Sequence, residues 1–161
     1  MAIIVEDGTG VPLANSYVSE AELEQFADLR GIVLDGEPEA LLHLAMDYVE
    51  TLGFLGEKTA SDQALQWPRT GVEIDGYLLE STVIPTELKN GVIQTALAIS
   101  QGNDPQAERE REVIEESVGA LGVKYAPTGE SGTVRKTISA ALKKLTRSTA
   151  SSANFNVQRA L

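Results

Sequence analysis

Three segments of the chain place apolar residues at the three- and four-residue spacing of an amphipathic helix. The first starts at Ser19, which precedes Glu22 by the three residues of a capping box. The second spans residues 39–52, and the third runs from Pro85, a favourable first-turn residue, to Gly102. The pattern therefore predicts a mainly α-helical body, built as a small helical bundle.

Two short runs of β-branched and apolar residues follow, at 113–118 and 123–126. The glycine-rich segment 119–122 between them suits a hairpin connection. An isolated two-stranded hairpin is marginal in water and leaves two edges unpaired. We therefore expect this hairpin either to fold back on the body or to pair with a neighbouring copy of the chain.

Residues 53–84 show no helical or alternating period and hold several glycines and the only tryptophan, Trp67. A tryptophan in an irregular stretch most often fills the core and pins the loop. Because Trp and Arg are enriched at interface hot spots, Trp67 together with Arg69 could instead anchor a protein contact.

Charge divides the chain into an acidic part and a basic part. Residues 1–123 carry 23 acidic and 6 basic side chains, whereas residues 124–161 carry 7 basic side chains and one acid, so that the whole chain has a net charge of −11. A Pro/Gly/Ser-rich segment at 127–133 reads as a flexible linker. We expect a body at 1–126, with the hairpin at about 113–126, and an extended basic C-terminal arm at 134–161.

The basic arm suits an anionic partner, which could be nucleic acid or an acidic protein surface. Only Phe155 follows Tyr125 as an aromatic residue, so a surface for stacking bases is poor. An apolar stripe at helical spacing, which phosphate binding does not require, favours docking on a protein. The residues expected to dock are Arg135, Lys136, Ile138, Leu142, Lys143, Lys144, Leu145 and Arg147.

No catalytic, metal or cofactor site is indicated, and we expect a protein that is not an enzyme. The chain has no cysteine, which excludes disulfides and thiolate zinc sites. His43 shares a helical face with Glu39 and Asp47, but no second histidine or cysteine completes a transition-metal site. No apolar run is long enough to cross a membrane, and the acidic start of the chain is unlike a signal peptide. We expect synthesis in the cytoplasm.

Four segments together resemble one known family. They are residues 8–19, with Ala14-Asn15-Ser16-Tyr17; residues 63–72, with Trp67-Pro68-Arg69; Ile84-Pro85; and residues 113–126. They are similar to the head–tail adaptor proteins of tailed bacteriophages, also called head-completion or connector proteins. Members of this group are often described as DnaT-like single-stranded-DNA-binding proteins.

The resemblance implies a structural protein of the virion neck, between capsid and tail. Its copies would form a ring, commonly a dodecamer, that contacts the portal protein through the basic arm and tail or neck proteins on the other side. DNA would pass through the lumen without specific binding. The residues that we expect at the subunit interface are Trp67, Arg69, Val113, Val118, Val123 and Tyr125.

The alternative function is that of a replication accessory that binds single-stranded nucleic acid. It predicts salt-sensitive binding to oligonucleotides that depends on Lys143, Lys144 and Arg147. The adaptor function instead predicts that removal of residues 134–161 leaves a folded body that no longer completes phage heads.

Overall fold

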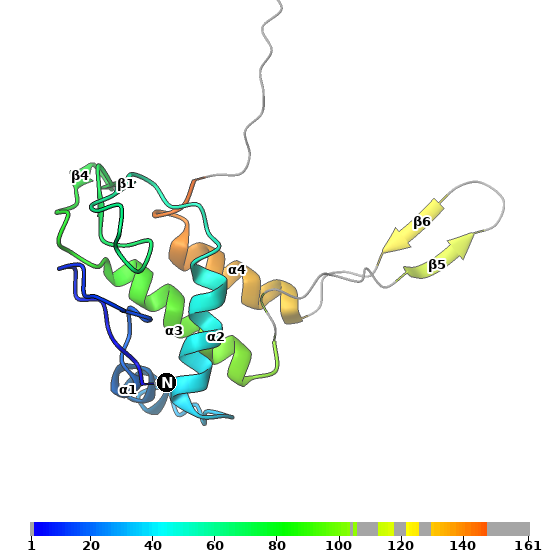
Figure 1. The fold of residues 1–161 in the computed structure, drawn as a ribbon. Coiled ribbons are helices and arrows are strands. Elements are labelled where there is room, and N and C mark those ends of the chain that lie inside the picture. The colour runs from blue at the N-terminus through cyan, green and yellow to red at the C-terminus, as the bar shows by residue number, and fades with distance from the viewer. Residues whose placement is uncertain (1, 104, 106–112, 118–121, 126–129, 148–161) are drawn as a thin grey trace, which may run out of the picture.

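A computed structural model describes residues 2–103, 105, 113–117, 122–125 and 130–147. These residues contain four α-helices, and the prediction of a mainly helical fold is confirmed (Figure 1). The helices are α1 (Glu20–Asp28), α2 (Pro38–Val49), α3 (Thr86–Ser100) and α4 (Glu130–Leu142). Helices α1 to α3 correspond to the three segments predicted from apolar spacing, and α4 spans the end of the expected linker and the start of the expected arm.

Six short strands form three antiparallel pairs in the described part of the chain. The pairs are β1 (Glu57–Lys58) with β2 (Arg69–Thr70), β3 (Glu73–Ile74) with β4 (Tyr77–Leu78), and β5 (Val113–Ser117) with β6 (Gly122–Tyr125). The last pair confirms the predicted hairpin, with Val113 opposite Tyr125 and Ser117 opposite Gly122. Among the described elements, β5 and β6 contact only each other, and Figure 1 shows them beyond the helices.

The start of α1 has the capping box that the sequence predicts. The Ser19 hydroxyl accepts a hydrogen bond from the Glu22 backbone N–H at 3.2 Å, and the Glu22 carboxylate accepts one from the Ser19 N–H at 2.8 Å. The same carboxylate lies 2.9 Å from the Lys89 ammonium of α3. One acidic side chain therefore both starts α1 and ties it to α3.

Helix α3 lies at the centre of the body, where α2 packs on it from one side and α4 from another. On α4 and the turn after it, Ile138, Leu142 and Leu145 are at most 2% exposed and belong to the same core as α2 and α3. The two helices approach closely because α3 has Gly91 at the contact. A Cβ atom at that position would lie 2.3 Å from Leu142 Cδ2.

The chain after α4 is also fixed to the body. Thr146 forms an antiparallel bridge with Phe54, and the N–H of Arg147 donates to the carbonyl of Gly53 at 2.8 Å. The expectation that the extended arm starts at residue 134 is therefore corrected up to residue 147, because Ile138, Leu142 and Leu145 belong to the body's core and Thr146 and Arg147 bond to the body. Residues 127–129 of the expected linker and 148–161 of the expected arm lie outside the described residues. The remaining residues of the expected linker, 130–133, form the first turn of α4, so a flexible linker is not found there.

A buried hydrogen-bond network joins the end of α2 to two loops. The Tyr17 hydroxyl donates to Glu50 Oε1 at 2.5 Å and accepts from the Trp67 backbone N–H at 3.0 Å. The other oxygen of Glu50 accepts from the N–H of Gln66 at 2.9 Å. Trp67 is fully buried, and its ring meets that of Phe54 edge-on at 6.0 Å. The network thus holds the irregular segment against the helices.

The same network perturbs its ionisable groups. Burial raises the pKa of the Glu50 carboxyl above its usual range, although the hydrogen bonds from Tyr17 and Gln66 favour the ionised form. Burial and the nearby charge of Glu50 also raise the pKa of Tyr17, so its hydroxyl stays a hydrogen-bond donor. The folded protein therefore holds the Glu50 proton more tightly than the unfolded chain does.

We predict that Gly91→Ala destabilises the fold. Alanine favours a helix by about 1 kcal/mol over glycine, but the added methyl group forces Leu142 to move, and such overpacking typically costs about 1–3 kcal/mol. We expect a net loss in the free energy of unfolding, measured by urea denaturation. Gly53→Ala is the control, because a Cβ atom there meets nothing within 4 Å. A Gly91→Ala protein as stable as the wild type would contradict the close contact of α3 and α4.

A second prediction concerns pH. Because the folded-state pKa of Glu50 lies above the unfolded value of 4.5, its contribution to stability falls as pH rises from that value through the folded pKa, by at most about 1.4 kcal/mol per unit. Glu50→Gln does not titrate. Urea denaturation at about pH 7 and about pH 5 should therefore show wild type gaining stability relative to Glu50→Gln at the lower pH. A difference that is constant, or that moves the other way, argues against a raised pKa.

Candidate nucleic-acid interface

The packing of α4 decides which of its side chains reach solvent. Since Ile138 and Leu142 face the core, Lys136 and Lys143 lie exposed on the other side of the helix and its final turn. They are seven residues apart, which is about two helical turns, and so share one face. Lys144 and Arg147 are exposed in the segment that follows. We call these four residues, Lys136, Lys143, Lys144 and Arg147, the α4 basic surface.

The four cations differ in how far they are already engaged. Among the described residues, Lys136 and Lys143 have no ion-pair partner, whereas the Lys144 ammonium lies 2.5 Å from Asp75 Oδ2. The hydrogen bond and charge of Asp75 raise the pKa of Lys144. Asp75 stands in the turn between β3 and β4, so this pair places that hairpin beside the end of α4.

Arg147 extends the positive charge towards β1. Its guanidinium reaches the carbonyl oxygen of Gly56 at 3.5 Å, and the buried guanidinium of Arg69 donates to the same oxygen at 2.7 Å. Burial lowers the pKa of Arg69, and the nearby positive charge of Arg147 lowers it further. Arg69 also donates to the Leu55 carbonyl at 2.6 Å, so its guanidinium stabilises the fold. Of the two arginines, Arg147 is the one exposed to solvent.

The predicted docking residues thus separate into two sets. Lys136, Lys143, Lys144 and Arg147 are exposed as the prediction requires, whereas the expectation that Ile138, Leu142 and Leu145 form a docking stripe is wrong, because these three fill the chain's own core. The side chain of Arg135 lies outside the described part of the structure. The argument that an apolar stripe needs a protein partner therefore no longer holds.

The predicted subunit-interface residues are corrected in part. Trp67 is 0% exposed and Arg69 is 7% exposed, and both are engaged within the chain, so neither presents its side chain to a neighbouring subunit. The interpretation of Trp67 as a core residue is confirmed. Val113, Val123 and Tyr125 lie on the β5–β6 hairpin, and Val118 lies outside the described residues. A role for these four in assembly stays a prediction.

The backbone N–H groups of the glycine-rich loop near the N-terminus donate to a carboxylate of the same chain. Fully buried Glu6 accepts hydrogen bonds from the backbone N–H groups of Gly8, Gly10 and Val11 at 2.8–2.9 Å. Phosphate-binding loops present such N–H groups to an anion. Because Glu6 occupies these donors, the loop cannot serve as a phosphate site.

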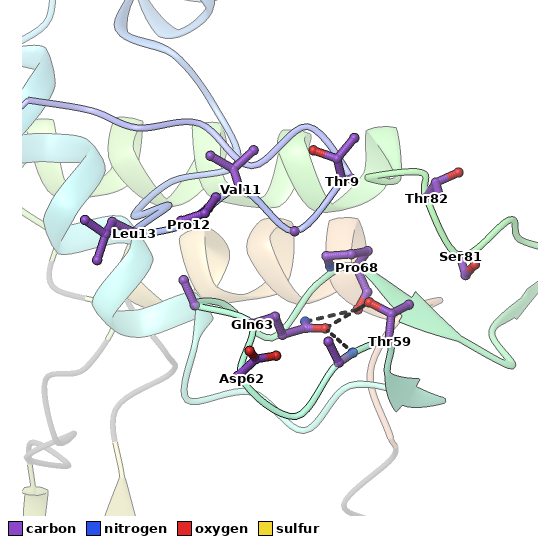
Figure 2. Close-up of a pocket in the computed structure, with 14 residues that line it drawn as sticks. Thr9, Val11, Pro12, Leu13, Thr59, Asp62, Gln63, Pro68, Ser81 and Thr82 are labelled. Carbon is purple, nitrogen blue, oxygen red and sulfur yellow. Dashed lines mark hydrogen bonds between the residues drawn. The ribbon is translucent and has the colours of Figure 1, made fainter.

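This loop forms one wall of a cleft of about 780 Å³. Figure 2 shows Thr9 to Leu13 on one side, with Thr59, Asp62 and Gln63 on the other. The Gln63 side chain is engaged internally, since it donates to Pro68 O at 3.1 Å and accepts from the N–H of Ala60 at 3.0 Å. The lining contains one carboxylate and no cation, so no positive charge there favours an anionic ligand.

His43, considered above as a metal ligand, has an acidic neighbour on the same helix. His43 Nε2 lies 3.8 Å from Glu39 Oε1, one turn away on α2. The described residues contain no cluster of three or more side chains suited to a metal ion.

A search of the described residues finds no helix with the length and apolar character to span a membrane.

Sequence reasoning missed the β3–β4 hairpin and its exposed aromatic residue. Asp75 and Gly76 both have positive φ, 52° and 85°, the geometry of a type I′ turn, in which an Asp-Gly pair is favoured. The Asp75-Gly76 dipeptide is therefore the sequence signal that predicts this hairpin. The next residue, Tyr77, is 80% exposed. The hairpin thus brings an exposed aromatic ring to the neighbourhood of Lys144.

Comparison with known families gives one match. A family model described as "Putative DnaT-like ssDNA binding protein" matches residues 1–160, which is nearly the whole chain. No curated protein and no solved structure matches the chain. The family match covers both the body and the α4 basic surface. The chain therefore belongs to this DnaT-like family.

Proposed function

We propose that this protein binds single-stranded DNA through the α4 basic surface. The observation that carries the proposal is the placement of four exposed cations on α4 and the five residues after it, set by the burial of Ile138, Leu142 and Leu145 behind them. Lysine and arginine side chains on a rigid structural element can neutralise successive phosphates of a nucleic-acid backbone. Membership of a family described as ssDNA-binding supports the same function.

The acidic body restricts where the strand can bind. Residues 1–123 carry 23 acidic and 6 basic side chains, so this part of the chain repels phosphate on balance. At about 0.1 M salt, charges more than about 10 Å apart are largely screened, so acids on distant faces oppose a strand on α4 only weakly. The expected consequence is local, salt-sensitive binding, with no general affinity for polyanions.

A paired lysine variant tests this function. Lys136→Ala/Lys143→Ala removes two exposed charges, and it should weaken binding to a fluorescein-labelled oligo(dT), measured by anisotropy. On a single strand each lost phosphate contact lowers the salt slope by about 0.7, so the slope should fall by about 1.4. Thermal unfolding should be unchanged, because both side chains are exposed.

The matched control is Arg30→Ala, which removes an exposed cation two residues after the end of α1, where it lies over the Phe26 ring. Its affinity and salt slope should equal those of the wild type. If the lysine variant binds oligo(dT) as the wild type does, the α4 basic surface is not the binding site.

A second candidate function is that of a head–tail adaptor that assembles into a ring. The observation that favours it is the β5–β6 hairpin, which contacts none of the other described elements and leaves one unpaired edge on each strand. Such edges can pair with a strand of another copy. The acidic body would also let DNA slide through a ring without adhering to it.

Two measurements test the adaptor function. Sedimentation of the full chain should show a closed oligomer that is lost when residues 113–125 are replaced by a short Gly-Ser segment. Electron microscopy of virions should show the chain as a ring between the portal and the tail. A chain that sediments as a monomer and is absent from virions is not an adaptor.

A further inference from the structure

Tyr77, whose side chain is exposed, lies near Lys144 of the α4 basic surface in the fold, although its sequence position is remote from α4. Asp75, two residues before Tyr77, pairs with Lys144 across 69 residues of sequence. Two residues of chain span at most about 7 Å, so the Tyr77 backbone lies within that distance of the Asp75 backbone. The fold thus combines an aromatic side chain with cations that the sequence keeps apart.

We propose that Tyr77 stacks on a base of the bound strand and so makes the interface selective for single-stranded over duplex DNA. The inference rests on the proposed function and deepens it, since it assigns a residue that recognises the base. The cations of α4 contact phosphates, which single and double strands share. The face of a base is accessible only where the base is unpaired.

The geometry of the β3–β4 hairpin suits this role. Tyr77 is 80% exposed, and the preceding type I′ turn, with Asp75 and Gly76 both at positive φ, defines the path of the backbone. The ion pair with Lys144 links the turn to the end of α4. A ring held on a short, anchored hairpin loses little conformational freedom when a base stacks on it.

Charge at the hairpin is compatible with a nucleotide. Of the exposed acids close to Tyr77 in sequence, Glu73, Asp75 and Glu80, the nearest is Asp75, and its charge is offset by Lys144. Lys143 and Lys136 continue along α4 without an ion-pair partner among the described residues, so they remain able to bind phosphate. The combination of stacking ring and cations is the one by which sequence-tolerant proteins bind single strands.

The test compares Tyr77→Ala with Tyr77→Phe in the full chain, using oligo(dT) and a duplex of the same length. Stacking on one base contributes about 1–3 kcal/mol, so Tyr77→Ala should bind oligo(dT) about 5- to 150-fold more weakly. Tyr77→Phe keeps the ring and should bind like the wild type. Binding of the duplex should be the same in all three proteins.

A third variant reports contact directly. Tyr77→Trp places an indole at an exposed position, whereas the native Trp67 is fully buried. Stacking of a thymine on the new ring should quench its fluorescence during titration with oligo(dT), and the duplex should leave it unchanged. Equal quenching by both ligands, or none while oligo(dT) binds, would overturn the inference.

The outcomes separate this inference from the function on which it rests. If Lys136→Ala/Lys143→Ala loses affinity for oligo(dT) but Tyr77→Ala does not, the α4 basic surface is supported as the binding site and the stacking role of Tyr77 is ruled out. If Tyr77→Ala weakens single-strand and duplex binding equally, the ring does not select for single strands. If Tyr77→Ala alters only self-association, the exposed ring contacts a second copy, and the inference is overturned. If the wild type does not bind oligo(dT), both proposals fail.

Discussion

The burial of α4 against α3 is the contact on which the rest of the structure depends. It needs Gly91, because a side chain there would overlap Leu142, and it hides Ile138 and Leu145 from solvent. In consequence the cations between these apolar residues must face outward. A segment that would otherwise be a charged tail becomes a helix with a defined orientation, and its positive charge acquires a fixed place on an acidic protein.

The residues of the N-terminal and Trp67 segments, which carry the family resemblance, stabilise the fold, whereas other residues are proposed to bind DNA. Tyr17 and Trp67, which belong to the resembling segments, form with Glu50 an internal network that joins two loops to the end of α2. Buried hydrogen bonds of this kind are costly to break, because a group left without its partner keeps its desolvation cost. These motifs stabilise the fold, whereas the proposed interface lies on a surface of lysine and arginine side chains.

Local signals predicted the helices and the β5–β6 hairpin well, since each depends on neighbours in sequence: the capping pair of Ser19 and Glu22, and the proline before α3. The apolar spacing on α4 was also visible, but spacing cannot say whether such a stripe faces the chain's own core or a partner. For the same reason the proximity of Tyr77 to Lys144, which rests on an ion pair across 69 residues, was beyond sequence reasoning. The correct signal for that hairpin, Asp75-Gly76, is local, and it was missed in a segment read as irregular.

The most direct test of this account is hydrogen exchange of the free protein at the backbone amides of α4. If α4 is part of the core, the amides of residues 138–142 should exchange as slowly as those in the middle of α3, in the absence of any DNA or protein partner. Exchange at the rate of an unstructured peptide would mean that α4 is a tail in solution. In that case neither the outward basic face nor its position beside Tyr77 would exist before a partner binds.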